Sequence, residues 1–356
     1  MPPKFTINPN IAQAETLPAE FYQNKNYFSE SKEKIFGPSW QFISDTHTLD
    51  RANIYPFSFL KGYIDEPLLL IKNKKSINCY SNVCTHRAHL VANQPCQANK
   101  LRCPYHGRIY NLDGTFNSMS GFENVENFPT NRDNLQSIPT MIWKIFIFVS
   151  LNPSIEISQI LKDMEIRLPH FPFEELTYNK YYSKTWEINA HWALYCENYL
   201  EGFHVPFVHK GLAKDIDVGT YETQLLENGV LQIAEGENEI EILNDSGYTS
   251  RNIYGLYYWI FPNIMLNFYS WGVSVNIIEP LTLEKTRVRF LSYTLPSNEQ
   301  PKESDASLDT VELEDQLVVQ NVQKGIKSRF YKRGRYSPEH EKGVHHFHRL
   351  LGKYLH

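Results

Sequence analysis

The stretch Cys84-Thr-His86 is followed, after sixteen residues, by Cys103-Pro-Tyr-His106-Gly107, and these two motifs decide how the chain is interpreted. Each motif places one thiolate and one imidazole on a short loop. Two such loops can hold a [2Fe–2S] cluster, with both cysteines on one iron and both histidines on the other. Zinc is the alternative, because Cys2His2 sets also bind zinc. Zinc fingers pair cysteine with cysteine and histidine with histidine, so the mixed pairs favour the cluster.

A second group of candidate ligands lies in Glu197-Asn-Tyr-Leu-Glu201-Gly-Phe-His204-Val-Pro-Phe-Val-His209. The proline between the two histidines disfavours a continuing helix, so both imidazoles can reach one metal where a helix ends. Two histidines and one carboxylate form the facial triad of non-haem Fe(II) oxygenases. The carboxylate must come from elsewhere, and the acidic stretch 308–316 offers four, each of which could instead be solvated: Asp309, Glu312, Glu314 and Asp315.

Length and composition limit the possible classes of protein. A chain of 356 residues exceeds the usual size of one hydrophobic core and predicts two domains. The 35 basic and 40 acidic residues give a net charge of −5, which does not indicate nucleic acid or an anionic membrane as partner. No apolar run reaches the ~18 residues of a membrane span. The odd count of five cysteines does not indicate a disulfide framework. We expect a cytoplasmic protein.

Hydrophobic patterning predicts an α+β fold in which a small all-β domain precedes a larger domain with an antiparallel sheet flanked by helices. Residues 11–36 are predicted to be helical. Short β-rich runs separated by turn signals follow, at 40–44, 68–72, 77–81, 108–111 and 141–151. Beyond residue 156 the pattern predicts helices over 158–164, 190–209 and 308–329 and strands over 181–188, 254–261, 265–269, 274–278 and 286–294.

The cluster motifs resemble those of a known family. Cys84-Thr-His86-Arg87, Cys103-Pro-Tyr-His106-Gly107 and Tyr110-Asn-Leu-Asp-Gly114 look like the Rieske domain of the aromatic-ring-hydroxylating oxygenases. Respiratory Rieske proteins usually carry a disulfide beside the cluster, whereas His89 and Tyr105 occupy those positions here, so the resemblance is to the oxygenase branch. It implies the alpha (oxygenase) subunit of a Rieske-type non-haem iron oxygenase, with an N-terminal helical segment (1–37) packing on the catalytic domain, a Rieske domain (38–155) and a catalytic iron domain (156–356).

The resemblance also implies roles for individual residues. Cys84, His86, Cys103 and His106 match the ligands of the Rieske cluster. The family's third iron ligand is an acid in a late helix, often an Asp after a Glu, with Gln-x-Gly some residues later. Glu314-Asp315 and Gln323-Lys-Gly325 match this pattern, which implies mononuclear Fe(II) held by His204, His209 and Asp315. Glu201 matches an acid that links this iron to a Rieske histidine of a neighbouring subunit, and Asn198 matches a polar residue near the iron.

The implied reaction uses O2 and electrons from a separate NAD(P)H-dependent reductase, directly or through a ferredoxin, to hydroxylate or N-dealkylate a small organic substrate in a homotrimer. The run from Glu197 to Glu201 resembles the choline, glycine-betaine and carnitine monooxygenase branch, which suggests a quaternary ammonium substrate. Aromatic residues within 254–271 could surround such a cation, although core packing is their commoner role. Aromatic-ring dihydroxylation, O-demethylation and a Rieske electron carrier without oxygenase activity remain the alternatives.

Three histidines near the C-terminus invite a further metal site. They lie in Gly343-Val-His-His-Phe-His-Arg-Leu-Leu-Gly352, which has the apolar spacing of an amphipathic helix. We expect this terminal helix to be structural.

Overall fold

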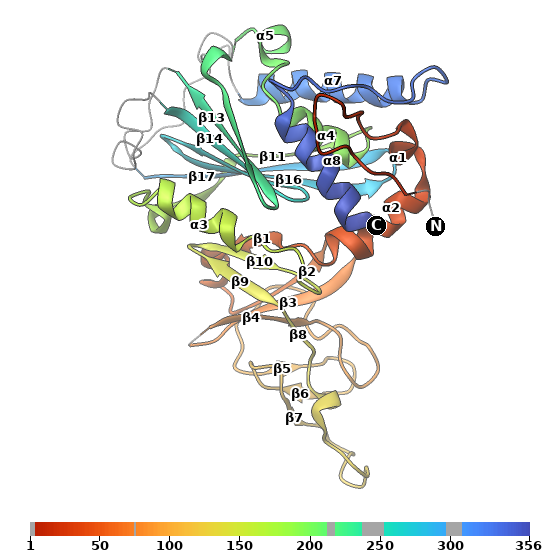
Figure 1. Cartoon of the computed structure of the whole chain (residues 1–356). Helices are drawn as coiled ribbons and strands as arrows, with labels where there is room; N and C mark the ends of the chain where they lie inside the picture. Colours follow the sequence, from red (N-terminus) through yellow and green to blue (C-terminus); the bar gives the residue numbers. More distant parts are fainter. Residues whose placement is uncertain (1–3, 75, 212–217, 237–252, 297–307) are drawn as a thin grey trace. The chain divides into compact units, whose positions relative to one another are not determined.

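The structure is a computed structural model that describes residues 4–74, 76–211, 218–236, 253–296 and 308–356 (Figure 1). The chain forms two compact units. The small unit is Trp40–Ser154, and the large unit combines Met1–Ser39 with Ile155–His356. The predicted α+β class is confirmed, because short antiparallel strands build the small unit and one antiparallel sheet with helices builds the large unit.

Three small sheets make up the small unit, and all their paired strands are antiparallel. The first contains β1 (Gln41–Asp45), β10 (Phe146–Val149) and β9 (Thr140–Trp143). The second contains β2 (Ile54–Phe59), β3 (Glu66–Lys72), β4 (Ile77–Ser81) and β8 (Ser137–Ile138). The third contains β5 (Leu101–Arg102), β6 (Ile109–Tyr110) and β7 (Phe116–Ser118), and it carries the second cluster motif.

The β-rich run predicted over residues 141–151 contains two strands. It forms the β9–β10 hairpin, with Trp143 opposite Phe146. Lys144, at the turn, adopts a positive φ of 52°, which reverses the chain within an otherwise strand-like sequence.

The large unit contains a seven-stranded antiparallel sheet. Its spatial order is β11 (Thr177–Ile188), β17 (Lys285–Thr294), β16 (Gly272–Thr282), β15 (Ile264–Tyr269), β14 (Ile253–Ile260), β13 (Gly229–Glu235) and β12 (Glu222–Leu226). The sequence patterns predicted five of these strands and missed the β12–β13 hairpin, whose two-residue turn is Glu227-Asn228.

The segment predicted to be helical over 11–36 is helical from Ala19 to Phe36, apart from Asn24. It contains α1 (Ala19–Gln23), α2 (Lys25–Ser31) and a π-helical turn (Lys32–Phe36). Asn24 separates the first two helices because its backbone is extended, and its side chain accepts the N–H of Asn26 as the cap of α2. The cap at Asn24 therefore divides a segment whose apolar residues have continuous helical spacing.

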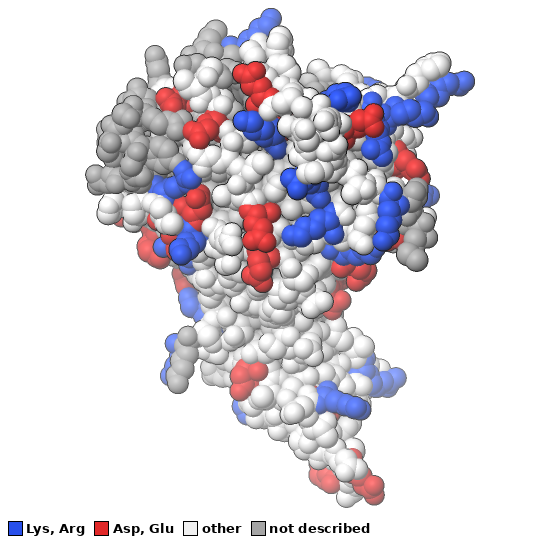
Figure 2. All heavy atoms as spheres, in the orientation of Figure 1, with Lys and Arg blue, Asp and Glu red and all other residues white. Residues whose placement is uncertain are grey.

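The described residues of the large unit form five further α-helices: α3 (Ser158–Arg167), α4 (Trp192–Tyr199), α5 (Val205–Val208), α7 (Leu308–Ile326) and α8 (Lys342–Leu355). Helix α4 packs on strand β16 and contacts both α7 and α8 (Figure 1). Among the described residues, no helix is long and apolar enough to cross a membrane. Basic and acidic side chains are intermingled on the face drawn in Figure 2, in keeping with the nearly balanced charge.

Candidate functional site

Three side chains of the large unit converge at one point. Oδ1 of Asp315 lies 3.0 Å from Nε2 of His209 and 3.4 Å from Nε2 of His204, and the two Nε2 atoms are 3.2 Å apart. Within the described part of the chain, this is the single group of three or more His, Cys, Asp or Glu side chains whose ligand atoms all lie within 4.8 Å of one another. Two imidazoles and one carboxylate suit non-haem Fe(II) and leave coordination positions free.

Local structure explains the five-residue step between the two histidines. Helix α4 ends at Tyr199, and the four-residue helix α5 begins after His204 with Pro206 in its first turn. Proline is accepted there because the first turn leaves its N–H groups unpaired anyway. His209 then ends α5, so both imidazoles flank one helical turn and face α7, which supplies Asp315.

A further carboxylate binds the outer nitrogen of each histidine. Oε1 of Glu201 lies 2.6 Å from Nδ1 of His204, and Oε2 of Glu201 accepts the backbone N–H of His204 at 3.0 Å. Oε2 of Glu314 lies 2.7 Å from Nδ1 of His209. Each Nδ1–H therefore has an acceptor, which leaves each Nε2 free to coordinate a metal. Sequence reasoning named Glu314 only as an alternative ligand and missed this contact, which a helical pattern alone does not reveal.

The charges of the site are balanced within it. Burial alone would raise the pKa of Asp315, but hydrogen bonds from His204 and His209 hold that pKa below its usual value. Burial alone would lower the pKa of His204, but hydrogen bonds to Asp315 and Glu201 raise it to about 9. The pKa of His209 is raised as well, because hydrogen bonding to Asp315 outweighs its burial. A metal bound at this point would displace the protons on the two Nε2 atoms, while Glu201 and Glu314 still accept hydrogen bonds from Nδ1.

The two other polar residues of α4 differ in their surroundings. The side chain of Asn198 is partly buried and makes no hydrogen bond to any residue that the structure describes, so its proposed place near the iron stays a prediction. Glu197 accepts a hydrogen bond from the hydroxyl of Tyr22 at 2.7 Å and lies 3.2 Å from Nε2 of His348. Glu197 thus ties the N-terminal segment and α8 to α4.

A group of tyrosines lies beside the histidine–carboxylate cluster. Val205, next to His204, forms a small apolar cluster with Ala234, against which Tyr221, Tyr254 and Tyr257 pack while remaining partly buried. Two glycines make room for these rings. A Cβ on Gly202 would lie 3.0 Å from the ring of Tyr221, and one on Gly255 would lie 2.7 Å from the phenol of Tyr257.

The tyrosine group continues along the sheet. The ring of Tyr269 has its centroid 5.7 Å from that of Tyr257 and 6.3 Å from that of Tyr254. Burial raises the pKa of Tyr221 and of Tyr257, so their phenols stay neutral. By contrast, Tyr258 and Trp259 are fully buried core residues, as the commoner reading of this aromatic stretch predicted.

The small unit brings the four predicted cluster residues together from two loops. Cys84 and Cys103 are buried thiols, whereas His86 and His106 lie nearer the surface with ring centroids 4.8 Å apart. Each loop turns tightly, because the N–H of Ala88 bonds to the carbonyl of Cys84 and the N–H of Gly107 bonds to that of Cys103. Two thiolates inside and two imidazoles outside fit a [2Fe–2S] cluster, whose ligands are spread over two irons.

A hydrogen bond also reaches one of these sulfurs. The hydroxyl of Tyr110 donates to Sγ of Cys84 at 3.2 Å. Burial raises the pKa of Tyr110 to about 12, so this phenol remains a donor at neutral pH. The sequence placed Tyr110 in the family motif without assigning it this contact.

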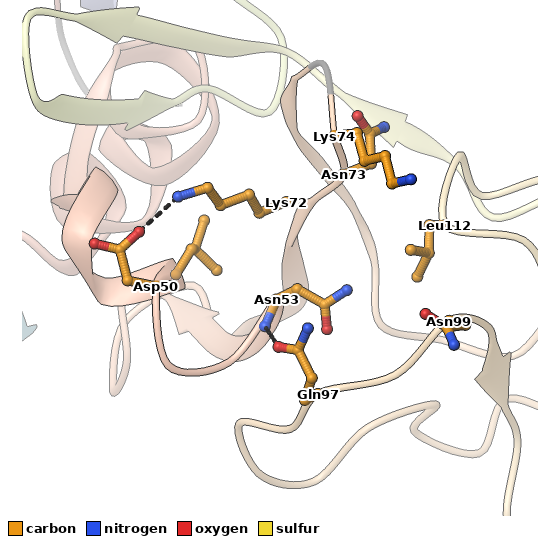
Figure 3. Close-up of a pocket in the computed structure, with 9 residues that line it drawn as sticks. Asp50, Asn53, Lys72, Asn73, Lys74, Gln97, Asn99 and Leu112 are labelled. Carbon is orange, nitrogen blue, oxygen red and sulfur yellow. Dashed lines mark hydrogen bonds and ion pairs between the residues drawn. The ribbon is translucent and has the colours of Figure 1, made fainter.

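Figure 3 shows a hollow on the small unit that is lined by several amides and lysines. Its polar groups are largely used within the loops. The amide of Asn53 bonds to both backbone groups of Ala98, Gln97 accepts the N–H of Asn53, and Lys72 pairs with Asp50 at 2.6 Å. We assign no site to this hollow.

The three histidines of α8 are structural, as expected. His345 and His346 bond through Nε2 to the backbone carbonyls of Asn8 and Leu226, both at 2.8 Å. Nδ1 of His348 lies 2.6 Å from the hydroxyl of Tyr336. Each imidazole makes its hydrogen bond to a different residue of the large unit, and these bonds anchor the terminal helix.

Comparisons with known proteins define the class. The family model for the ring hydroxylating alpha subunit (catalytic domain) matches residues 173–356, just over half of the chain, and that for the Rieske [2Fe-2S] domain matches residues 39–129. The chain therefore belongs to the ring-hydroxylating alpha subunits and is the oxygenase component of a Rieske-type non-haem iron oxygenase. Its cofactors are a Rieske [2Fe–2S] cluster and mononuclear iron, and it receives electrons from a partner. A Rieske electron carrier would not match the catalytic domain.

Relatives with known names are similar over nearly the whole chain. The carnitine monooxygenase oxygenase subunit of Escherichia coli (strain K12) is 29% identical, over 99% of this chain and 96% of its own length. Chloroplastic choline monooxygenase of Arabidopsis thaliana is 27% identical, over 96% of this chain and 83% of its own length.

Solved structures share the fold. The quaternary ammonium Rieske monooxygenase CntA in complex with its substrate L-carnitine aligns with a TM-score of 0.78 and 23% identity, covering 100% of both chains. Naphthalene 1,2-dioxygenase from Rhodococcus sp. bound to indole aligns with a TM-score of 0.74 and 15% identity, covering 95% of this chain and 93% of that one.

Proposed function

We propose that this chain oxidises a quaternary ammonium compound at Fe(II) held by His204, His209 and Asp315. The observation that carries the proposal is the convergence of these three side chains beside a group of partly buried tyrosines. In the small unit, Cys84, His86, Cys103 and His106 are proposed as the ligands of the Rieske cluster, because two buried thiols and two outer histidines meet there.

When bound, the cluster would supply one-electron transfer and the mononuclear iron would supply a site for O2 activation; the protein positions the groups around them. Glu201 and Glu314 each hold the proton on an Nδ1, so both Nε2 atoms face the third ligand, Asp315. The short helix α5 holds His204 and His209 on one turn. Asp315 supplies the negative charge of the ligand set from α7.

The substrate proposal rests on the tyrosine group. Neutral, electron-rich rings attract a desolvated cation by about 0.5–2 kcal/mol each. Tyr221, Tyr254 and Tyr257 offer such rings next to Val205, the residue that follows His204. No carboxylate is needed to bind a trimethylammonium group by this route. The two named monooxygenases that act on choline and carnitine favour the same class of substrate for this chain.

The source of the electrons is proposed from the sequence. It carries no Gly-rich dinucleotide fingerprint, so a separate NAD(P)H-dependent reductase, with or without a ferredoxin, is proposed to reduce the Rieske cluster. A homotrimer is proposed, in which Glu201 couples the iron site to a Rieske histidine of a neighbouring subunit. Glu201 suits this task because it already bonds to Nδ1 of His204. A cytoplasmic location completes the proposal.

Counting iron and acid-labile sulfide per chain on anaerobically purified protein tests both ligand assignments. The expected result is near three irons and two sulfides, falling to two irons and two sulfides in His204→Ala. Loss of sulfide in Cys103→Ala with the third iron retained would support the division between the two sites. Two irons in both the parent and His204→Ala, with no gain after Fe(II) is added, would refute the mononuclear site. Substrate-dependent O2 uptake, screened first with choline-like and carnitine-like cations, then tests the substrate class.

A further inference from the structure

Arg108 is a charged residue buried in the small unit, directly after the second cluster motif. Only 1% of its surface is exposed. Its guanidinium lies 2.5 Å from Oδ1 of Asp133 and over the rings of Phe116 and Phe128, with centroid distances of 4.8 and 5.4 Å. Nε of Arg108 has no hydrogen-bond partner among the described residues. Because arginine keeps its proton in proteins, a full positive charge is held there.

The Arg108–Asp133 pair contacts both cluster loops. The carbonyl of Arg108 accepts the N–H of Cys103 at 2.8 Å, which places the arginine on the second loop. The carbonyl of Asp133 accepts the hydroxyl of Thr85 at 2.8 Å, next to Cys84 on the first loop. The pair is therefore part of the immediate surroundings of the four cluster residues.

Packing alone does not explain a buried arginine. Replacing a buried ion pair by apolar residues of similar volume is often neutral or stabilising, and this pair is incompletely hydrogen-bonded. The aromatic rings around Arg108 could pack equally well against an apolar side chain. A fixed positive charge has a different effect on a cluster that gains one negative charge when it is reduced, because it favours the reduced state.

We propose that Arg108 raises the reduction potential of the Rieske cluster and that Asp133 partly offsets this effect. The proposal rests on the ligand assignment of the proposed function. Other positive groups nearby contribute less, because Arg87 and Arg102 are exposed and water screens them. In this proposal Arg108 acts through the electrostatic field at the cluster and does not touch the substrate.

The test is the midpoint potential of the cluster in the full-length protein, measured by a redox titration followed by electron paramagnetic resonance. Arg108→Met removes the buried charge, so the ratio of reduced to oxidised cluster at a fixed potential should fall about tenfold. For a one-electron couple this is a midpoint potential lower by about 59 mV. Arg108→Lys keeps the charge and should stay near the parent. Asp133→Asn leaves the guanidinium uncompensated and should shift the potential upward. Arg102→Met is the matched control, since it removes an exposed guanidinium beside Cys103 and should shift the potential less.

The proposal is supported if the midpoint potential falls in Arg108→Met and rises in Asp133→Asn, with full sulfide content in both variants. If the pair only held the two loops in place, both substitutions would shift the potential in the same direction. Equal signs, or an unchanged potential in Arg108→Met, would overturn it. If Arg108→Met fails to assemble a cluster, the sign of the Asp133→Asn shift decides alone. A parent protein without sulfide would instead refute the ligand assignment, so the two failures are distinguishable.

Discussion

Oε2 of Glu314 lies 2.7 Å from Nδ1 of His209, on the side of the ring opposite Asp315. Two consecutive residues of α7 thus hold the two nitrogens of one imidazole. Because His209 is almost fully buried, its ring has little freedom apart from these two contacts. Glu314 therefore fixes which nitrogen of His209 faces the shared ligand point, just as Glu201 does for His204.

Glu314→Leu should weaken Fe(II) binding by about 10–100-fold, the usual effect of losing a carboxylate that orients a ligating histidine. Glu314→Gln should show a smaller loss, since its amide oxygen still accepts a hydrogen bond. Fe(II) titration of the metal-free protein measures the change. Glu174→Gln, at an exposed carboxylate in the large unit, is the control and should bind as the parent does. An unchanged affinity in Glu314→Leu would show that the contact does not position His209.

Tyr257→Leu should reduce the preference for a cationic substrate. Removing one cation–π contact of about 0.5–2 kcal/mol weakens binding of a trimethylammonium ligand by roughly 2- to 30-fold. An uncharged tert-butyl analogue should lose much less, because it depends on apolar contact alone. Tyr257→Phe keeps the ring and should resemble the parent. Calorimetric titration with both ligands makes the comparison, and equal losses for the two ligands would argue against a tyrosine cage.

Tyr110→Phe should lower the reduction potential of the cluster. The hydroxyl of Tyr110 donates a hydrogen bond to Sγ of Cys84, and donors to the sulfurs stabilise the extra electron of the reduced state. The ring itself stays in place, so iron and sulfide contents should be unchanged. A redox titration of the variant beside the parent checks the shift. A potential equal to that of the parent would mean that the hydroxyl serves only to hold Thr85.

Short-range motifs carried most of what the sequence predicted. The residues of each pair, Cys84 and His86, Cys103 and His106, and His204 and His209, lie within a few residues of one another, so spacing alone indicates that each pair belongs to one metal site. Asp315 follows His209 by 106 residues, and only the resemblance to a family selected it from four acids. Spacing cannot do this, because the position of α7 against α5 depends on tertiary packing.

The contacts that the sequence did not reveal are those between distant elements. Glu314 reads as an ordinary solvated acid until α7 is placed beside His209. Arg108 begins the β-rich run predicted over 108–111, and nothing local shows that Phe116, Phe128 and Asp133 close around its side chain. Helical spacing over 11–36 did not show the division between α1 and α2, because capping by Asn24 competes with that spacing.

His191 should make the large unit less stable as the pH falls. Its imidazole is buried at the start of α4, where Nδ1 accepts the N–H of Ala193 at 3.3 Å, and burial lowers its pKa to about 3. In the unfolded chain the pKa is near 6.5, so between these values only the unfolded state binds the proton. The free energy of unfolding should therefore be highest above pH 6.5 and fall by at most about 1.4 kcal/mol per pH unit toward pH 3.

Hydrogen exchange of the α4 amides in metal-free protein, corrected for intrinsic rates, measures this loss between pH 7 and pH 4. His191→Asn is the comparison, because asparagine also caps helices but does not titrate. The variant loses the ring contacts of His191 with Phe21 and Tyr22, so it should be less stable at pH 7. Its α4 amides should nevertheless lose less protection per pH unit than those of the parent. His204 and His209 titrate in both proteins, so their contribution cancels in the difference. Parallel pH profiles would show that His191 can take up a proton without opening α4.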